Sequence, residues 1–315
     1  MGAGVIVGSN VLNLAALLGL GAVVAGRIRV HSKVVALGGA VAVWVAGVCL
    51  ATVAGVVPVD VGLWLALAAV AVYVLVLGAG RGGLERLRLP RRWVTWLGSA
   101  VSEEELELQD AIRPRQGRWP DAVAAVAALI VVVAASVTME RAASAIGSRY
   151  AVPEIVLGGL VLAAVTSLPN AVAAVYLAAR GRGAATFSTA LNSNTLNVTA
   201  GLLVPAAVIG LGRPSGQALL ITAWYAILTV AVLAAAYRVH GLGRAAGLLI
   251  IAAYAAFTVS VLVSAGEISP APRLLAVPGA AGAAAGVAAA FARRRWAARA
   301  AGIVPFPAHP GDGTG

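Results

Sequence analysis

Long apolar stretches, each nearly free of charge, dominate this chain. A helix needs roughly 20 apolar residues to cross the ~30 Å hydrocarbon core of a bilayer. Nine stretches reach about that length: 3–25, 34–57, 59–80, 121–145, 153–179, 185–212, 215–237, 245–265 and 273–292. Of the 315 residues 61% are hydrophobic and 11% charged, whereas soluble domains carry about 25% charged residues. These values predict an all-α polytopic membrane protein with about nine transmembrane helices. They exclude a soluble enzyme, a disordered chain and a disulfide scaffold.

Basic residues divide unequally between the loops that join these stretches. If the first loop is cytoplasmic, that side holds all but four of the 23 lysines and arginines, the exceptions being Arg141, Arg149, Arg213 and Arg273. Loops rich in Lys and Arg stay on the cytoplasmic side of a membrane. The pattern predicts a multi-pass protein of the plasma membrane, with its N-terminus outside and its C-terminus in the cytoplasm. It also explains the net charge of +11 without a nucleic-acid partner.

A short polar motif occurs twice inside apolar stretches. Residues 8–13 read GSNVLN and residues 192–197 read NSNTLN. By the topology above, the first copy enters the membrane from outside and the second from inside. One motif on two oppositely oriented helices is typical of an inverted repeat, in which a transport site lies near the middle of the bilayer.

A further polar cluster lies on the stretch before the second copy. Residues 165–170 read VTSLPN, and Pro169 removes a backbone donor there. Polar groups at this depth are costly unless they face a cavity or a neighbouring helix. Hydroxyl and amide oxygens suit hard cations such as Na⁺ or Ca²⁺. We therefore predict a cation site on two facing helices, formed by Thr166, Ser167, Asn170, Ser193, Asn194 and Asn197.

Residues 153–203 resemble the second α-repeat of the cation/Ca²⁺ exchanger superfamily, the sodium/calcium exchanger membrane region. The family pattern there is GTSLPE on one helix and GSNxxN on the next. Residues 5–19, VIVGSNVLNLAALLG, resemble the end of the first α-repeat, and the resemblance extends over about residues 1–265. It implies that Ser9, Asn10 and Asn13 supply matching ligands for a transported ion.

The family fold has ten helices, arranged as two inverted halves joined by a cytoplasmic loop. The resemblance implies an incomplete first repeat of three helices at 1–80, a cytoplasmic linker loop at 81–120 and a second repeat of five helices at 121–265. An extra helix and a basic, Pro- and Gly-containing tail would occupy 266–315. We therefore expect an incomplete inverted-repeat exchanger fold.

The family pattern is only partly matched. Met1 stands immediately before the first GSN segment, so we expect the first two helices of the family fold, with one of its two ion-binding glutamates, to be missing. Asn170 stands where the family has the other glutamate, and no Asp or Glu lies at the middle of a predicted span. Carboxylates normally offset the dehydration of Ca²⁺, so a neutral site should bind Ca²⁺ weakly. Two explanations are open: an incomplete start, or a degenerate relative that handles another ion or none.

The resemblance implies an antiporter of the sodium/calcium exchanger type, which works by alternating access within the lipid bilayer. Its ligands would be inorganic cations, transported rather than resident, and no cofactor is expected. No Walker A loop, GxSxG elbow or HExxH helix occurs, so catalytic residues are not expected. The alternative is a non-transporting membrane scaffold or partner protein with the same fold.

Overall fold

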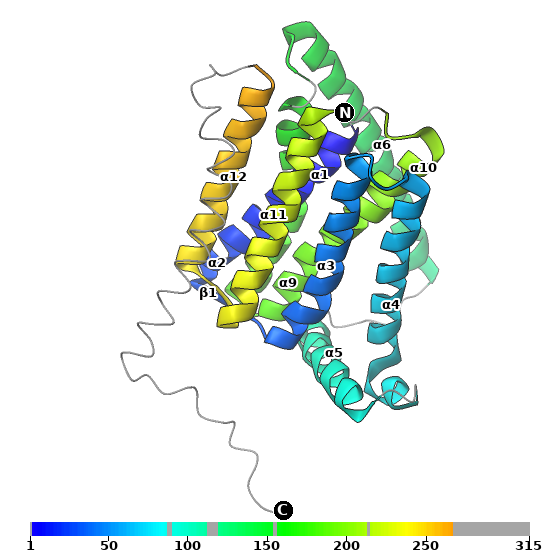
Figure 1. The fold of residues 1–315 in the computed structure, drawn as a ribbon, viewed down its shortest axis with the longest axis vertical. Helices are drawn as coiled ribbons and strands as arrows, with labels where there is room; N and C mark the ends of the chain where they lie inside the picture. Colours follow the sequence, from blue (N-terminus) through cyan, green and yellow to red (C-terminus); the bar gives the residue numbers. More distant parts are fainter. Residues whose placement is uncertain (1, 87–89, 112–118, 154–155, 213–214, 267–315) are drawn as a thin grey trace, which may run out of the picture.

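The computed structural model describes residues 2–86, 90–111, 119–153, 156–212 and 215–266, and most of them are helical (Figure 1). The first part of the chain forms α1 (Gly2–Asn13), the π-helix η1 (Leu14–Leu20), α2 (Gly21–Ala25), α3 (Ser32–Val53), α4 (Val59–Arg86) and α5 (Arg91–Ala111). The second part forms α6 (Trp119–Tyr150), the π-helix η2 (Leu157–Leu162), α8 (Ala163–Ala179), α9 (Gly183–Leu196), the π-helix η3 (Asn197–Leu203), α10 (Val204–Ile209), α11 (Gly216–Val239) and α12 (Arg244–Ser264). Strands β1 (Arg27–Arg29) and β2 (Gly241–Gly243) pair antiparallel, with Ile28 opposite Leu242.

Six helical segments of the described chain are long and apolar enough to cross a membrane: Ile6–Ala25, Ser32–Val53, Val59–Ala79, Leu157–Ala179, Gly216–Val239 and Arg244–Ser264. They correspond to six of the nine predicted spans and confirm the helical membrane architecture. The stretches 121–145 and 185–212 are also helical, within α6 and along α9–η3–α10, but are not among the six. The predicted span 273–292 lies outside the described residues. The predicted linker 81–120 contains the end of α4 and all of α5.

Two of the interrupted helices carry the repeated motif, and they run in opposite directions. In Figure 1, α1–η1–α2 passes from the upper end of the molecule to the lower end, and α9–η3–α10 passes from the lower end to the upper. η1 begins directly after Asn13, and η3 begins at Asn197, the equivalent position of the second motif. Helix α1 contacts both α9 and η3. The two motifs therefore share a local helix distortion as well as their sequence. π-Helical turns are rare and often mark functional sites.

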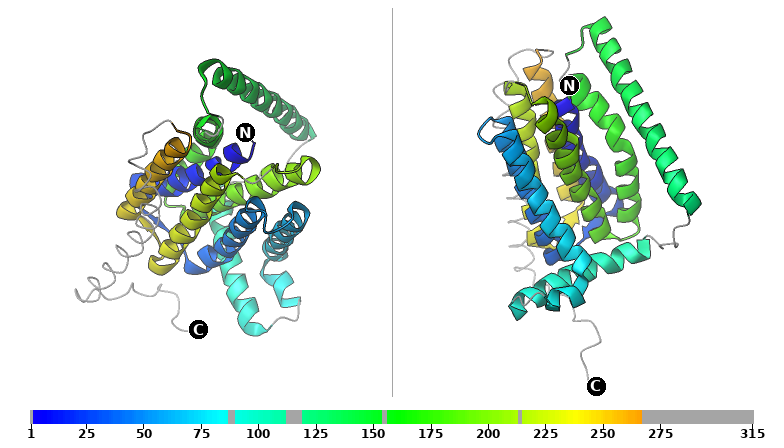
Figure 2. Two further views of the ribbon diagram at one scale, coloured as in Figure 1. Left: turned by 45° about the horizontal axis from the view of Figure 1, so that its top comes forward. Right: turned by 90° about the vertical axis from the view of Figure 1, so that its right-hand side faces the viewer.

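The other helices surround this crossing. Helix α1 also contacts α8 and α11, and α12 packs along η1. Figure 2 shows α5 across one end of the bundle and α6 along its outside, where α6 contacts η2. The outward faces carry large exposed apolar side chains such as Trp64, Leu75 and Val208. An exposed apolar exterior of this kind is suited to contact with lipid.

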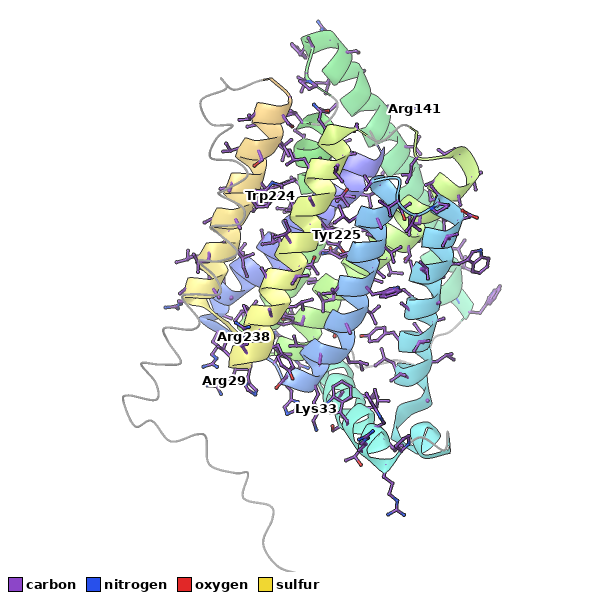
Figure 3. All side chains as sticks on the ribbon, in the orientation of Figure 1. Arg29, Lys33, Arg141, Trp224, Tyr225 and Arg238 are labelled. Atoms are coloured by element: carbon purple, nitrogen blue, oxygen red, sulfur yellow. The ribbon has the colours of Figure 1, made fainter. Side chains whose placement is uncertain are left out.

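Basic side chains gather at the end of the bundle where α3 begins and α11 ends. Figure 3 labels Arg29, Lys33 and Arg238 at this end, whereas Arg141 lies toward the opposite end. The Arg27 guanidinium donates to the Val239 carbonyl (3.0 Å) beside the β1–β2 pair. Of the basic residues labelled there, the three assigned to cytoplasmic loops lie at one end, and Arg141, assigned to the other side, lies toward the opposite end.

Helices α1 and η2 approach each other so closely that only glycine fits between them. A β-carbon on Gly8 would overlap the carbonyl oxygen and Cα of Gly159. Small residues allow this close approach between helices in membranes, where packing rather than water exclusion drives association. The contact holds the start of the first polar motif against the segment that leads into α8.

We expect Gly8→Ala to destabilise the protein by about 1–3 kcal/mol, because the methyl group forces the two backbones apart. Thermal unfolding in detergent should show a clear loss of melting temperature. Gly47→Ala is the matched control, since nothing lies within 4 Å of a β-carbon at that helical position. The control should be neutral or stabilising, and an equal loss in both variants would refute the close contact.

Candidate functional site: a polar crossing of inverted helices

The structure brings all nine predicted site residues together on three elements of the bundle. They lie on α1 (Ser9, Asn10 and Asn13), on α8 (Thr166, Ser167 and Asn170) and on α9–η3 (Ser193, Asn194 and Asn197). Hydrogen bonds between these elements connect every member of the set. We call this set the polar crossing.

The centre of the polar crossing is a reciprocal pair of asparagines. Asn10 Nδ2 donates to the backbone oxygen of Asn194 (3.1 Å), and Asn194 Nδ2 donates to the backbone oxygen of Asn10 (3.1 Å). The two side chains are 0% and 1% exposed. Because they hold the same position in the two motifs, the bonds are related by an approximate two-fold axis.

The last asparagine of each motif repeats the same symmetry. Asn13 Nδ2 donates to Asn194 Oδ1 (2.8 Å), and Asn197 Nδ2 donates to Asn10 Oδ1 (2.9 Å). Each amide thus bonds the central asparagine of the opposite helix. Matched bonds of this kind follow when two copies of one motif meet in antiparallel orientation, as an inverted repeat requires.

Helix α8 contacts both motifs from one side. Ser9 Oγ and Thr166 Oγ1 share a hydrogen bond (2.9 Å), and Ser167 Oγ donates to the Ser9 backbone oxygen (3.4 Å). Asn170 Nδ2 donates to Ser193 Oγ (2.9 Å). The carbonyls of Leu162 and Ala163 also accept from the Thr166 hydroxyl. The sequence TSLPN therefore places two polar side chains against the serine of the first motif and one against the serine of the second.

Exposure divides the polar crossing into a closed side and an open side. Asn10, Asn13 and Asn194 are buried, whereas Thr166 is exposed and Asn170 is half-buried. Of these residues, the two more exposed, Thr166 and Asn170, both lie on α8, so the exposed side of the polar crossing is the α8 side.

The polar crossing is electrically neutral, and its ligand chemistry is that of amide and hydroxyl oxygens. The described residues contain no group of three or more His, Cys, Asp or Glu side chains that could hold a metal ion. Most amide N–H groups are used in bonds between helices, but Asn13 Oδ1 is buried and accepts no hydrogen bond. An unmatched buried oxygen is costly, and a cation is one partner that would satisfy it.

Sequence reasoning missed one polar neighbour of this site. Tyr225 on α11 is fully buried, and its hydroxyl lies beside Asn10. The sequence offers one indication of this role: Tyr225 is an aromatic residue with a hydroxyl group in the middle of the predicted span 215–237. That signal does not show which way the side chain faces.

Comparison with known proteins identifies one family. Residues 121–263 match the family described as sodium/calcium exchanger protein. No curated protein and no solved structure matches the chain. The matched region contains α8, α9 and η3, with two thirds of the polar crossing, and it begins well after α1.

Proposed function

We propose that the protein carries a cation across the membrane through the polar crossing, because residues 121–263 match the sodium/calcium exchanger family. The match supports a membrane transporter rather than an enzyme. The proposed ligands are the nine side chains of the polar crossing. The proposed mode is antiport of the sodium/calcium exchanger type, by alternating access.

The observation that carries this proposal is the two-fold set of asparagine bonds. Asn10 and Asn194 hold each other's backbones, and Asn13 and Asn197 each bond the asparagine opposite. Two inverted halves around one central site have two equivalent arrangements, each open toward one face of the membrane. The rearrangement of a few neutral hydrogen bonds is a small step compared with the exposure of buried charge.

The neutral ligands bear on the choice of ion. A doubly charged ion loses more hydration than a singly charged one, and protein sites for Ca²⁺ usually repay that loss with carboxylates. The polar crossing has none. We therefore propose that it binds Na⁺ in preference to Ca²⁺.

The basic end of the bundle supports an orientation as well. Arg29, Lys33 and Arg238 lie at one end (Figure 3), and such ends remain cytoplasmic. We propose that the protein spans the plasma membrane with this end in the cytoplasm and its N-terminus outside.

One feature favours the alternative, a membrane scaffold that transports nothing. The amides of the polar crossing already find partners within the protein, and such bonds between helices stabilise membrane bundles by about 0.6 kcal/mol each. In that case the asparagines would serve helix association alone.

Uptake into proteoliposomes separates the two functions. We expect the purified protein to take up radioactive Na⁺ when the vesicles contain unlabelled Na⁺ or Ca²⁺, and to take up radioactive Ca²⁺ more slowly. Protein-free vesicles give the background rate. A folded protein that moves neither ion above background would contradict transport of these ions and favour the scaffold.

A further inference from the structure

Tyr225 carries a buried hydroxyl without a hydrogen-bond partner. Its side chain is 0% exposed and projects from α11 at the middle height of the bundle (Figure 3). In the described part of the chain, three buried side-chain oxygens lack a partner: Asn13 Oδ1, Thr52 Oγ1 and Tyr225 Oη. Two of these three belong to the polar crossing or lie beside it.

Among the side chains that interact with the Tyr225 hydroxyl, Asn10 offers the strongest hydrogen-bond acceptor. Asn10, Thr229 and Cys49 are among the side chains that interact with this hydroxyl. The Thr229 hydroxyl already donates to the Tyr225 backbone oxygen (2.7 Å), and a thiol is only a weak acceptor. Asn10 Oδ1 accepts one bond, from Asn197 Nδ2 (2.9 Å). An amide oxygen has two lone pairs, so Asn10 Oδ1 can accept a second hydrogen bond, from the Tyr225 hydroxyl.

A bound cation would give partners to both unmatched atoms, Asn13 Oδ1 and Tyr225 Oη. A cation attracts amide oxygens, and Asn13 Oδ1 is free to become a ligand. If Asn197 turns its own oxygen toward the ion, its Nδ2 leaves Asn10 Oδ1, and the Tyr225 hydroxyl, which interacts with Asn10, would replace it. One binding event would then satisfy both atoms that the described arrangement leaves unmatched.

We propose that Tyr225 is a positioning residue of the polar crossing, whose hydroxyl donates to Asn10 Oδ1 in the cation-bound state and so frees Asn197 to face the ion. Tyr225 does not touch the ion in this scheme, because it acts through Asn10. The inference rests on the proposed transport function and adds to it a residue on α11.

The test is Tyr225→Phe, which removes the hydroxyl and keeps the buried ring. The described arrangement gives that hydroxyl no partner, so the melting temperature without cation should be unchanged or slightly higher. The dissociation constant for the preferred cation should rise about ten-fold, equivalent to about 1.4 kcal/mol. Binding is measured with NaCl and with CaCl₂ separately, by calorimetry and by the cation-induced rise in melting temperature, in a choline chloride background.

Tyr254→Phe is the matched control. Tyr254 lies on α12, where its ring packs against Phe257 with centroids 5.7 Å apart, and it makes no bond to the polar crossing. The control should leave both the melting temperature and the dissociation constant unchanged.

Three other outcomes would contradict the inference, and they can be told apart. If wild type binds a cation and Tyr225→Phe binds it equally well, the positioning role is wrong and the proposed function survives. If Tyr225→Phe lowers the melting temperature without cation, the hydroxyl already has a structural bond and the switch is wrong. If wild type binds neither cation, the proposed function fails and this inference fails with it.

Discussion

We expect Asn197→Ala to lose almost all cation flux in proteoliposomes while the protein still folds and inserts. The substitution removes the bond from Asn197 Nδ2 to Asn10 Oδ1 (2.9 Å) and one ligand oxygen at the start of η3. A buried acceptor left without its donor costs about 1–3 kcal/mol. Together with the lost ligand we expect flux to fall by about 100-fold, which corresponds to about 2.8 kcal/mol. Uptake of radioactive Na⁺, divided by the amount of folded protein in the vesicles, is the measurement.

Gln217→Ala provides the comparison for Asn197→Ala. Gln217 also uses a side-chain amide to join two helices, donating from Nε2 to the Ser264 carbonyl (3.0 Å), but it lies at the start of α11 and outside the polar crossing. Its loss should lower stability slightly and leave flux near the wild-type rate. Flux that survives in Asn197→Ala would mean that the ion passes elsewhere.

The polar crossing was predictable because its residues carry a pattern that local sequence reveals. SNVLN and SNTLN are short and repeated, and TSLPN places three polar side chains in an apolar stretch where lipid excludes them. The distribution of basic residues among the loops then predicted that the two motif-bearing helices run in opposite directions. Opposite direction and similar sequence together were enough to predict that the two motifs meet, and Asn10 and Asn194 do meet.

Other features depend on contacts between distant residues, which no local pattern reveals. Strands β1 and β2 pair Arg27 with Gly243 although more than 200 residues separate them. The overlap that a side chain on Gly8 would cause depends on the backbone of Gly159. The place of Tyr225 beside Asn10 likewise requires the packing of α11 on α1. The π-helical turns η1 and η3 consist mostly of apolar residues that are equally compatible with an ordinary helix.

Asn170→Glu should convert the neutral polar crossing into one that binds divalent ions. Residue 170 is half-buried on α8, and its side chain reaches Ser193 (2.9 Å) on the opposite helix. A carboxylate there is close enough to repay part of the dehydration of Ca²⁺. At an effective dielectric constant of about 20 the attraction between close charges is several kcal/mol, and desolvation of the carboxylate offsets most of it. We expect a net gain in Ca²⁺ affinity of about 10- to 100-fold, or about 1.4–2.8 kcal/mol.

Asn170→Gln separates charge from size, because glutamine has the length of glutamate and no charge. It should leave Ca²⁺ affinity as weak as in wild type, and Asn170→Glu should exceed it in calorimetry with CaCl₂ and in uptake of radioactive Ca²⁺. Equal Ca²⁺ affinity in the two variants would mean that position 170 does not face the ion. Since Asn170 bonds only Ser193 among the residues of the polar crossing, that result would assign α8 to helix packing and leave the asparagines of α1 and α9–η3 as the remaining candidates for the site.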